Sequence, residues 1–294
     1  MKIPAECGYY DTYFECITSV TTNLPIKSFS PTQTDAFSFC PRYWGFYRQK
    51  LKPKAILYPE MAAITGSATA KGLEVFYKER PASLEATVTA AHIALQRGSL
   101  EALAEGRYIA ASEQDKWAAM ADNVALLLKT HAKCDPFKDY TVVEVEQTGD
   151  DHDRPDLIVR DDIGLLVVDF KCKLTLKTEW VPKEQAKWRR AWQLHHYAIR
   201  RGIARFAVCL ITPHTRRGCH YEIVQVDERY AKLWQQDAAQ LWAEMDFAVG
   251  LPLDQLRGNT SHANEYGECA YWSEACSHGM DPAMLANNLI KVGG

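Results

Sequence analysis

The chain has 294 residues, of which 47% are hydrophobic and 24% are charged. These fractions exclude intrinsically disordered, collagen-like and low-complexity proteins, and the length allows a substantial hydrophobic core. Lysine and arginine number 34 against 37 acidic residues, a formal net charge of −3 that excludes a histone-like basic coat. A local basic groove would still suffice for nucleic-acid binding.

Neither a secretory signal nor a membrane helix is predicted. Residues 1–16 lack a basic segment followed by an apolar run, and no stretch reaches the ~18 apolar residues that a spanning helix needs. The nine cysteines are scattered without a CxxC pair, so we expect reduced thiols unless some of them bind metal. The expected location is the cytosol.

The first half of the chain is predicted to be helical. Ser30 and Pro31 mark the start of a helix, and Pro41 then permits only a bend or a new start. Further helices are expected at 62–79, 83–97 and 112–133. In this interpretation Gly98 ends the second of these three. The helices carry no chemical motif, and we interpret them as packing elements.

The second half alternates strands with long helices. Strands are expected at 140–147, 156–160, 165–170, 205–212 and 221–226. Long helices are expected over 182–201 and from Asp227 to about Gly250, and the tail from Leu251 resembles a loop. The run LLVVDF is apolar almost throughout, as a central buried strand is. The order of elements predicts an α/β core with a helical N-terminal elaboration.

Two aspartates are predicted to face each other on neighbouring strands. If residues 161–164 form a hairpin loop, Arg160 lies opposite Leu165. The same register places Asp156 opposite Asp169, with Cβ atoms about 4.5–5.5 Å apart on one face of the sheet. Two carboxylates at that distance repel each other, and burial raises the cost. A divalent cation bound by both would offset it.

Lys171 lies two residues past Asp169 and therefore points to the same face. Its ammonium would orient a water or neutralise charge that develops on a phosphate. Two acids, a cation and a lysine are the parts of a phosphodiester hydrolase. An ordinary hairpin with two solvated aspartates explains the same spacing, and the spacing alone does not separate the two interpretations.

The helix that follows favours the hydrolase. Gln193 and Tyr197 are four residues apart and share one helical face. The same helix is rich in basic residues, namely Lys183, Lys187, Arg189, Arg190, Arg200 and Arg201. This charge suits a phosphate backbone, although each basic residue taken singly is more often solvent-facing. Trp188 and Trp192 lie among these charges, and we interpret them as core packing.

Three motifs in this order resemble the PD-(D/E)XK nuclease superfamily, and most closely its RecB-like branch. They are Arg154-Pro155-Asp156, Asp169-Phe170-Lys171 and Gln193-Leu194-His195-His196-Tyr197. Their order and spacing make the likeness fairly specific. That branch includes the CRISPR-associated RecB-like exonucleases and many phage-encoded nucleases, and the run Cys40-Pro41-Arg42-Tyr43 resembles its N-terminal step.

The resemblance implies a restriction-endonuclease-like core, with a central mixed sheet flanked by helices, and a Mg²⁺- or Mn²⁺-dependent nuclease. Asp156 and Asp169 would hold the cation, and Lys171 would be the catalytic lysine. Gln193 and Tyr197 would support the site. DNA contacts are expected from Lys187, Arg189, Arg190 and Arg42.

The resemblance also implies a biological setting. The substrate would be single- or double-stranded DNA, and the reaction an exonuclease step of recombination, replication or repair. The protein would act in the bacterial cytoplasm, as a product of a bacterial or phage gene. Other recombination proteins would be its partners, and no membrane would be involved.

The sequence departs from this family at the first core helix. Relatives carry a histidine or an acid there in a G-x-x-x-H setting, and here Gly66 is followed by Ala70 at the histidine position. Alanine cannot bind metal. Glu74, one turn further on the same helical face, is the predicted replacement ligand. Ala70 leaves open an alternative, a catalytically impaired DNA-binding or assembly subunit that keeps the nuclease fold.

Many relatives also bind an iron–sulfur cluster through one cysteine near the N-terminal step and three near the C-terminus. Cys40 matches the first, and Cys269 and Cys276 match the last two. His262 lies in the stretch where the remaining cysteine would stand. This set of four would hold a 4Fe-4S cluster or Zn²⁺, whereas a tail that has lost its cluster would leave the thiols idle.

The resemblance and the element pattern together divide the chain into three segments. An N-terminal segment spans residues 1–27, and the nuclease core spans 28–250 with a helical insertion at about 80–135. The cysteine-containing tail spans 251–294 and, with a metal bound, would tie the two ends of the chain together.

Overall fold

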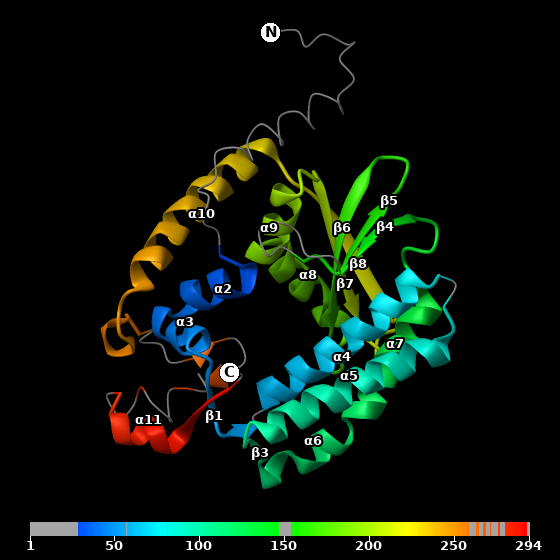
Figure 1. Cartoon of the computed structure of the whole chain (residues 1–294). Coiled ribbons are helices and arrows are strands. Elements are labelled where there is room, and N and C mark those ends of the chain that lie inside the picture. Colours follow the sequence, from blue (N-terminus) through cyan, green and yellow to red (C-terminus); the bar gives the residue numbers. More distant parts are fainter. Residues whose placement is uncertain are drawn as a thin grey trace, which may run out of the picture. The chain divides into compact units, whose positions relative to one another are not determined.

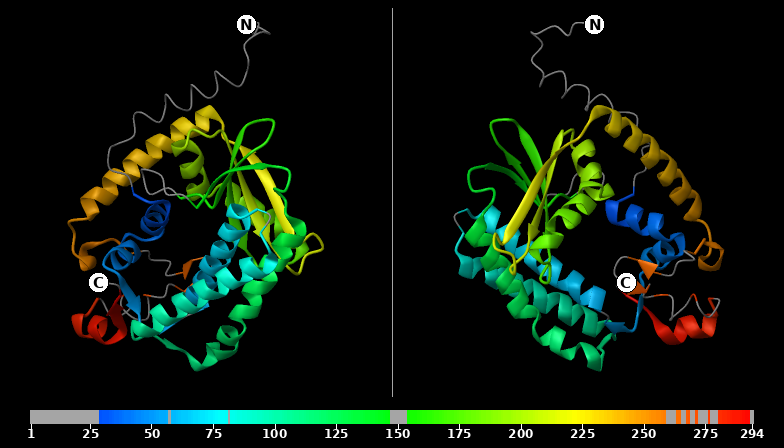
Figure 2. Two further views of the ribbon diagram at one scale, coloured as in Figure 1. Left: turned by 45° about the vertical axis from the view of Figure 1, so that its right-hand side comes forward. Right: turned by 180° about the vertical axis from the view of Figure 1, so that it is seen from behind.

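The computed structural model describes residues 29–56, 58–80, 82–146, 154–258, 263–264, 267–268, 271, 276 and 280–292. These residues form two compact units, and Figure 1 and Figure 2 show their elements coloured along the chain. The first unit contains the described residues up to Pro31 and residues 133–242, and the second contains residues 32–132 and the described residues from Ala243 onward. Within the described residues, no helix has the length and apolar character needed to cross a membrane.

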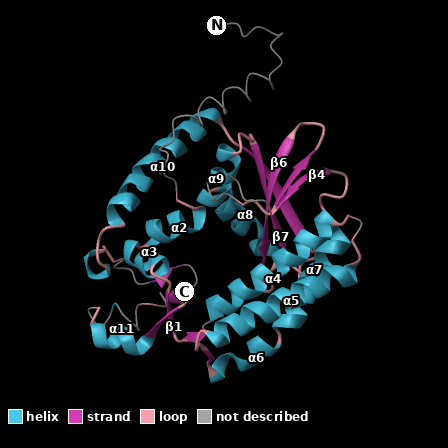
Figure 3. Cartoon of the chain, in the orientation of Figure 1, coloured by secondary structure: helices cyan, strands magenta, loops and turns pink. Residues whose placement is uncertain are grey.

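A five-stranded mixed sheet forms the centre of the first unit (Figure 3). Its strands, in spatial order, are β4 (Thr141–Val145), β5 (Leu157–Arg160), β6 (Leu165–Cys172), β7 (Arg205–Ile211) and β8 (Cys219–Gln225). Only β6 and β7, among these neighbours, pair in parallel. A parallel pair requires a crossover, which runs through α8 (Val181–Arg189) and α9 (Trp192–Arg200). The sheet and its flanking helices confirm the predicted α/β class.

The hairpin between β5 and β6 has the predicted register, because Arg160 pairs with Leu165. The Asp161 carboxylate closes the loop by accepting a hydrogen bond from the Gly164 amide at 3.0 Å. Arg205, at the start of β7, donates two hydrogen bonds to the same carboxylate, at 2.8 and 2.6 Å. This ion pair joins the hairpin loop to β7 and so helps to fix the alignment of the central strands.

β6 and β7 form the core of the sheet. Leu166, Val167 and Val168 are 0% exposed, and every residue of β7 is buried. Interior strands with a parallel neighbour are covered on both faces, which explains their nearly continuous apolar sequences. The prediction of a central buried strand over 165–170 is confirmed.

The structure corrects the single helix predicted over 182–201. α8 and α9 are separated at Ala191, which is extended with φ −65° and ψ 126°. The His195 ring donates to the Arg189 carbonyl at 2.9 Å, and so satisfies one of the carbonyls left free at a helix end. Neither glycine nor proline occurs at the break, so tertiary contacts rather than local propensity decide it.

The second unit is built mainly of helices. They are α2 (Pro31–Phe39), α3 (Pro41–Arg48), α4 (Tyr58–Lys78), α5 (Leu84–Ala104), α6 (Gln114–Ala118) and α7 (Met120–Cys134). The first residue of α2 and the last two of α7 belong to the first unit. The Cys40 thiol accepts the Tyr43 amide at 3.4 Å and caps α3. Of the two outcomes predicted at Pro41, a bend or a new start, the structure therefore has the new start. The helix predicted over 112–133 is interrupted at Ala119.

Gly98 does not end α5, which continues to Ala104 and corrects the prediction. A Cβ atom at Gly98 would lie 3.4 Å from Ile64 on α4. Gly72 on α4 is tighter still, because its Cβ would lie 2.7 Å from Leu128 on α7. A glycine inside a helix costs only about 1 kcal/mol relative to alanine, so close packing between helices outweighs that cost.

The remaining elements are short, apart from α10 (Glu228–Ala248). Asp227 accepts the Arg229 amide at 2.7 Å and begins α10 as predicted. Two small pairings are parallel β2 (Ala55–Ile56) with β3 (Tyr108–Ile109), and antiparallel β9 (Ala263–Asn264) with β10 (Gly267–Glu268). Single 3-10 turns lie at Ala111–Glu113, Thr178–Trp180 and Leu253–Gln255.

Part of the C-terminal tail, predicted as loop, has regular structure. α11 (Pro282–Asn288) leads into β11 (Leu289–Lys291), which pairs antiparallel with β1 (Leu51–Pro53). The Tyr271 ring stacks on Phe46 of α3, with ring centroids 4.5 Å apart. The tail is therefore packed against α3 and β1 within the second unit. The three predicted segments of the chain stay predictions.

Candidate active site

Two aspartates meet where β5 begins beside β6, as the sequence predicts. Leu157 pairs with Val168, and Asp156 and Asp169 are the residues next to this pair on the two chains, close enough for the Asp169 charge to act on Asp156. The Phe170 amide donates to Asp156 Oδ2 at 2.7 Å, and Asp169 is 1% exposed. Burial and the charge of Asp169 raise the pKa of Asp156 well above its ordinary value. The pair therefore resists holding two negative charges unless a cation joins it.

Lys171 lies on the same face of β6 as Asp169, two residues along the strand. Its Nζ is 2.8 Å from Asp169 Oδ2, and its side chain is 20% exposed. Burial opposes the positive charge, but the carboxylates of Asp169 and Asp156 outweigh burial and raise the pKa of Lys171 above its ordinary value. The ammonium is therefore charged at neutral pH and lies beside the acid pair.

α9 completes the site, because Gln193 and Tyr197 share the face that it turns toward Lys171. Lys171 Nζ donates to Gln193 Oε1 at 3.2 Å, and Gln193 Nε2 donates to the Tyr197 hydroxyl at 2.9 Å. Burial, with the two carboxylates nearby, raises the pKa of Tyr197 to about 12, so its hydroxyl keeps its proton. The structure thus brings five predicted site residues together: Asp156, Asp169, Lys171, Gln193 and Tyr197.

Trp188 lies against the site lysine, which corrects its interpretation as core packing. Its ring centroid is 4.6 Å from Lys171 Nζ and 4.7 Å from Lys187 Nζ. Its Nε1 donates to Glu184 at 2.9 Å, and Glu184 also pairs with Lys173 at 2.7 Å. Cation–π attraction therefore holds the Lys171 ammonium in place. The i, i+4 spacing of Glu184 and Trp188 is the sequence signal that could have found this contact.

The basic residues predicted to bind DNA are divided between the two units. Lys187, Arg189 and Arg190 lie at the end of α8 in the first unit. Arg189 is half-exposed and pairs with Glu222 of β8 at 2.6 Å. Arg42 lies on α3 in the second unit, where its Nε donates to a tail carbonyl at 3.2 Å. DNA contact by these four residues stays a prediction.

Glu74, the predicted replacement ligand, lies on α4 in the second unit, one turn after Ala70. Its carboxylate pairs with Lys71 at 2.6 Å and with Lys78 at 2.7 Å. Burial opposes ionisation, but the two lysines outweigh burial and lower the pKa of Glu74. Glu74 is therefore an ionised carboxylate held by its own helix, and its role as a metal ligand stays a prediction.

Cys40 and Cys276, the two described members of the predicted cysteine set, lie near each other in the second unit. Burial raises the pKa of the Cys276 thiol, the Arg42 guanidinium opposes this rise, and nearby Cys40 adds to it. His262 and Cys269 lie outside the described residues. The predicted 4Fe-4S or Zn²⁺ site therefore stays a prediction.

The acid pair has the chemistry of a divalent cation site. Carboxylate oxygens are the ligands that Mg²⁺ and Mn²⁺ prefer in proteins. The Phe170 amide holds the Asp156 carboxylate toward β6, and a cation between Asp156 and Asp169 would relieve the repulsion that raises the Asp156 pKa. The donor set therefore fits the cation that the sequence predicts.

A mixed sheet that presents an acid pair and a lysine beside a glutamine and a tyrosine has the arrangement of a phosphodiester hydrolase. The sequence profile of the PD-(D/E)XK nuclease superfamily matches residues 28–277. The chain belongs to this superfamily. Membership supports a nuclease and implies a DNA substrate, and nucleases of this superfamily generally use divalent metals.

Comparison with solved structures adds distant likenesses. The alkaline exonuclease LHK-Exo from Laribacter hongkongensis is 16% identical over 48% of this chain and 82% of its own, with a TM-score of 0.32. LHK-Exo in complex with dAMP is 15% identical over 62% and 88%, with a TM-score of 0.33. A third structure, SSO0001, is 15% identical over 68% and 87%, with a TM-score of 0.25. At such low values the assignment rests on the family match. Comparison with curated proteins found no match.

Proposed function

We propose that this protein is a divalent-metal-dependent deoxyribonuclease that removes nucleotides from DNA ends. The observation that carries the proposal is the contact of Lys171 with Asp169, whose charge also acts on the neighbouring Asp156. A charged lysine beside two neighbouring carboxylates has the groups that phosphodiester hydrolysis needs, namely a cation site and a hydrogen-bond donor. Membership of a nuclease superfamily supports this assignment.

Each residue of the cluster has a distinct role in the proposed reaction. Asp156 and Asp169 would hold Mg²⁺ or Mn²⁺, which when bound supplies Lewis-acid polarisation of the scissile phosphate. Lys171 donates hydrogen bonds to the phosphate oxygen on which negative charge develops. Gln193 holds the Lys171 ammonium, and the Tyr197 hydroxyl in turn holds Gln193. The hydrogen-bonded chain pre-organises the lysine before the substrate arrives.

The basic residues at the end of α8 would contact the substrate beside this cluster. Lys187, Arg189 and Arg190 follow one another within one turn of helix, and Lys187 shares the Trp188 ring with Lys171. Phosphate contacts of this kind position a nucleic acid without reading its sequence. We therefore propose that these residues guide the DNA backbone, with Arg42 as a further contact.

The proposed branch of the superfamily, the partners and the location rest on the motif resemblance. The Gln193–Tyr197 spacing and the nearness of Cys40 to Cys276 support a RecB-like exonuclease with a metal-stapled tail. In that setting the protein acts with other recombination proteins in the bacterial cytoplasm, on chromosomal or phage DNA. Glu74 would be the third cation ligand.

A second candidate function is favoured by one residue. Ala70 stands where relatives carry a metal-binding histidine or acid, and Glu74 is already paired with two lysines. A protein that has lost a ligand in this way would bind DNA or assemble with partners without cleaving. Cleavage and DNA binding must therefore be measured separately.

A nuclease assay separates the two candidates. Purified protein is incubated with end-labelled single- and double-stranded DNA in Mg²⁺, Mn²⁺ or EDTA. We expect cation-dependent release of nucleotides that falls about 10³-fold in Asp169→Asn and about 10²-fold in Lys171→Ala, because each variant removes charge stabilisation at the reacting phosphate. Covalently closed circular DNA should resist the enzyme if it requires ends.

Lys138→Ala is the matched control, because it removes the same charge from an exposed lysine of the same unit. This variant should cleave as the wild type does. Wild-type protein that binds labelled DNA but cleaves neither substrate with any cation would refute the nuclease and support the alternative.

A further inference from the structure

A second group of reactive side chains lies on the opposite face of the same sheet. Side chains alternate along a strand, so Phe170 points away from the face that Asp169 and Lys171 share. Cys209 on β7 pairs with Phe170 and lies on its face. Phe137 packs there as well, with its ring centroid 6.2 Å from that of Phe170. The two faces of β6 and β7 therefore carry different chemistry.

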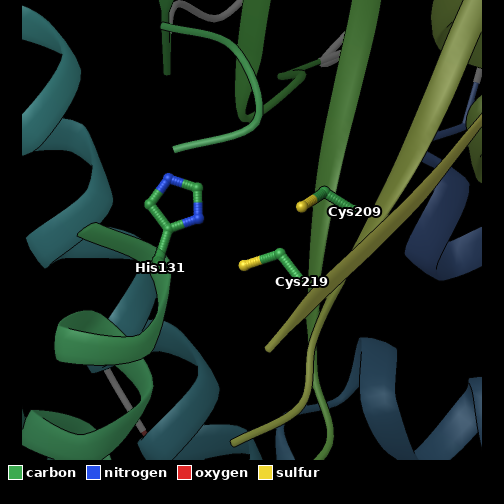
Figure 4. Close-up of side chains that lie close together, drawn as sticks. All are labelled: His131, Cys209 and Cys219. Carbon is green, nitrogen blue, oxygen red and sulfur yellow. The ribbon is translucent and has the colours of Figure 1, made fainter. Parts of the chain in front are cut away.

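Three cysteines meet on this second face, all within the first unit. Cys219 on β8 lies diagonally across from Cys209, their sulfurs are within 4.8 Å of each other, and Figure 4 shows both thiols pointing to the same side of their strands. Cys134, the last residue of α7, hydrogen-bonds to both the thiol and the backbone of Cys219. Its thiol also donates to the Arg217 carbonyl at 2.9 Å.

The sulfurs of Cys209 and Cys219 have a spacing close to that of a metal site, and Cys134 contacts Cys219 beside them. A tetrahedral zinc ion holds sulfur at about 2.3 Å, which places two of its sulfurs roughly 3.8 Å apart. Cys209 and Cys219 would need to move together by about 1 Å or less to reach that separation. Cys209 is 0% exposed and Cys219 9% exposed, whereas Cys134 is only half-buried. Cys134 therefore gives the buried pair a path to solvent.

Cysteine binds a metal ion as the thiolate, so an ion bound by these thiols would release their protons to the solvent.

We propose that Cys134, Cys209 and Cys219 bind one thiophilic divalent ion of the class of Zn²⁺. Sulfur ligands select such ions, whereas the carboxylates on the other face select Mg²⁺ and Mn²⁺. Three thiolates leave a fourth tetrahedral position for water or another donor. The bound ion joins the end of α7 to β7 and β8, so its role is structural and separate from the acid pair.

Cadmium titration tests this site, because cadmium–thiolate bonds give a charge-transfer band in the ultraviolet. The protein carries Cys40→Ser and Cys276→Ser, which remove the two neighbouring thiols of the second unit as a competing Cd²⁺ site. It is reduced before Cd²⁺ is added. We expect one equivalent of Cd²⁺ to saturate the band, with protons released to the solvent as it binds. Zn²⁺ added in competition should bleach the band.

Two variants and one control decide the outcome. Cys219→Ser should abolish the band, and Cys134→Ser, at a half-exposed position that tolerates substitution, should lower it by about a third. Cys172→Ser is the matched control, because Cys172 is a half-buried thiol on the same face of β6, two strands from Cys219. A band unchanged in Cys134→Ser, or lost equally in Cys172→Ser, would overturn the proposal, as would the absence of saturable Cd²⁺ binding.

Discussion

The two faces of the central sheet carry different ionisable groups, carboxylates on one and thiols on the other, and on both faces pKa values are raised. On one face Asp156 and Asp169 are opposed carboxylates, and burial with repulsion raises the pKa of Asp156. On the other face Cys134 and Cys219 are neighbouring thiols whose pKa values are also raised. Burial and Cys219 raise the pKa of Cys134, and the hydrogen bond with Cys209 together with burial raises that of Cys219. Both faces therefore gather groups that lose their protons only at a cost.

The difference between the faces lies in what surrounds these groups. Lys171, Gln193 and Tyr197 supply hydrogen bonds on the acid face, whereas Phe137 and Phe170 pack close to the thiols on the other. The acid face therefore suits a hard cation such as Mg²⁺ and a polar substrate. The thiol face suits a soft cation such as Zn²⁺ and no substrate. Strand alternation alone separates the two, because Asp169 and Phe170 are adjacent in sequence.

The largest expected effect is that Mn²⁺ and Zn²⁺ raise the Tm of the protein independently, each through its own face of the sheet. Ions that bind the folded state raise its stability by about 3 kcal/mol at a hundredfold excess over Kd. In the Cys40→Ser, Cys276→Ser background, Mn²⁺ should therefore raise the Tm of Cys219→Ser but not of Asp169→Asn. Zn²⁺ should do the reverse. Differential scanning fluorimetry in EDTA supplies the baseline, and one variant that lost both responses would show that the faces are not independent.

A smaller effect is expected from the residue that positions the site lysine. Trp188→Leu removes a cation–π contact worth about 0.5–2 kcal/mol, so kcat for DNA cleavage should fall about 10-fold. The pKa of Lys171 should fall with it, because the ring no longer stabilises the ammonium. The alkaline limb of the pH–rate profile should therefore move to lower pH.

Trp188→Phe keeps an aromatic face and should restore most of the rate and the original pH profile. A purely structural role of the indole would instead lower Tm in both variants and leave the pH profile unchanged. Trp192 is a suitable comparison, because its ring packs on Trp234 with centroids 4.8 Å apart. Trp192→Leu should therefore lower Tm without moving the pH profile.

Sequence reasoning recovers the acid face well, because its signals are local. A hairpin of known loop length fixes the register, so the opposition of Asp156 and Asp169 follows from counting residues. The i, i+4 spacing places Gln193 and Tyr197 on one helical face in the same way. The sheet class and the buried central strand follow from period and apolar runs.

The remaining features depend on contacts between distant segments. No residue near Ala191 predicts the end of a helix there. Gly98 does favour a helix end, but close packing lets α5 continue through it. The thiol cluster joins Cys134 to cysteines about 75 and 85 residues away, with no motif that links them. Such pairs become visible only when strand order and register are known.

The smallest expected effect concerns folding stability at neutral pH without metal. The ionised form of Asp161 should stabilise the folded protein, whereas the ionised form of Asp156 should destabilise it. Arg205 holds the pKa of Asp161 at about 2, so folding favours its ionised form. The Asp161 ion pair therefore contributes stability above the unfolded pKa near 4 and loses it as pH falls through about 2. Asp161→Asn should cost about 1 kcal/mol at pH 7, after allowance for solvent screening.

Asp156 should behave in the opposite way. Its pKa is raised by burial and by Asp169, so its ionisation opposes folding at neutral pH. This opposition declines as pH falls through the folded pKa and is gone below the unfolded pKa near 4. Asp156→Asn, whose amide oxygen can still accept the Phe170 amide, should therefore raise the urea midpoint in EDTA at pH 7. Equal midpoints for Asp156→Asn and the wild type at pH 7 would show that Lys171 already neutralises the pair. Adding Mn²⁺ should reverse the order, because only the wild type then gains the cation.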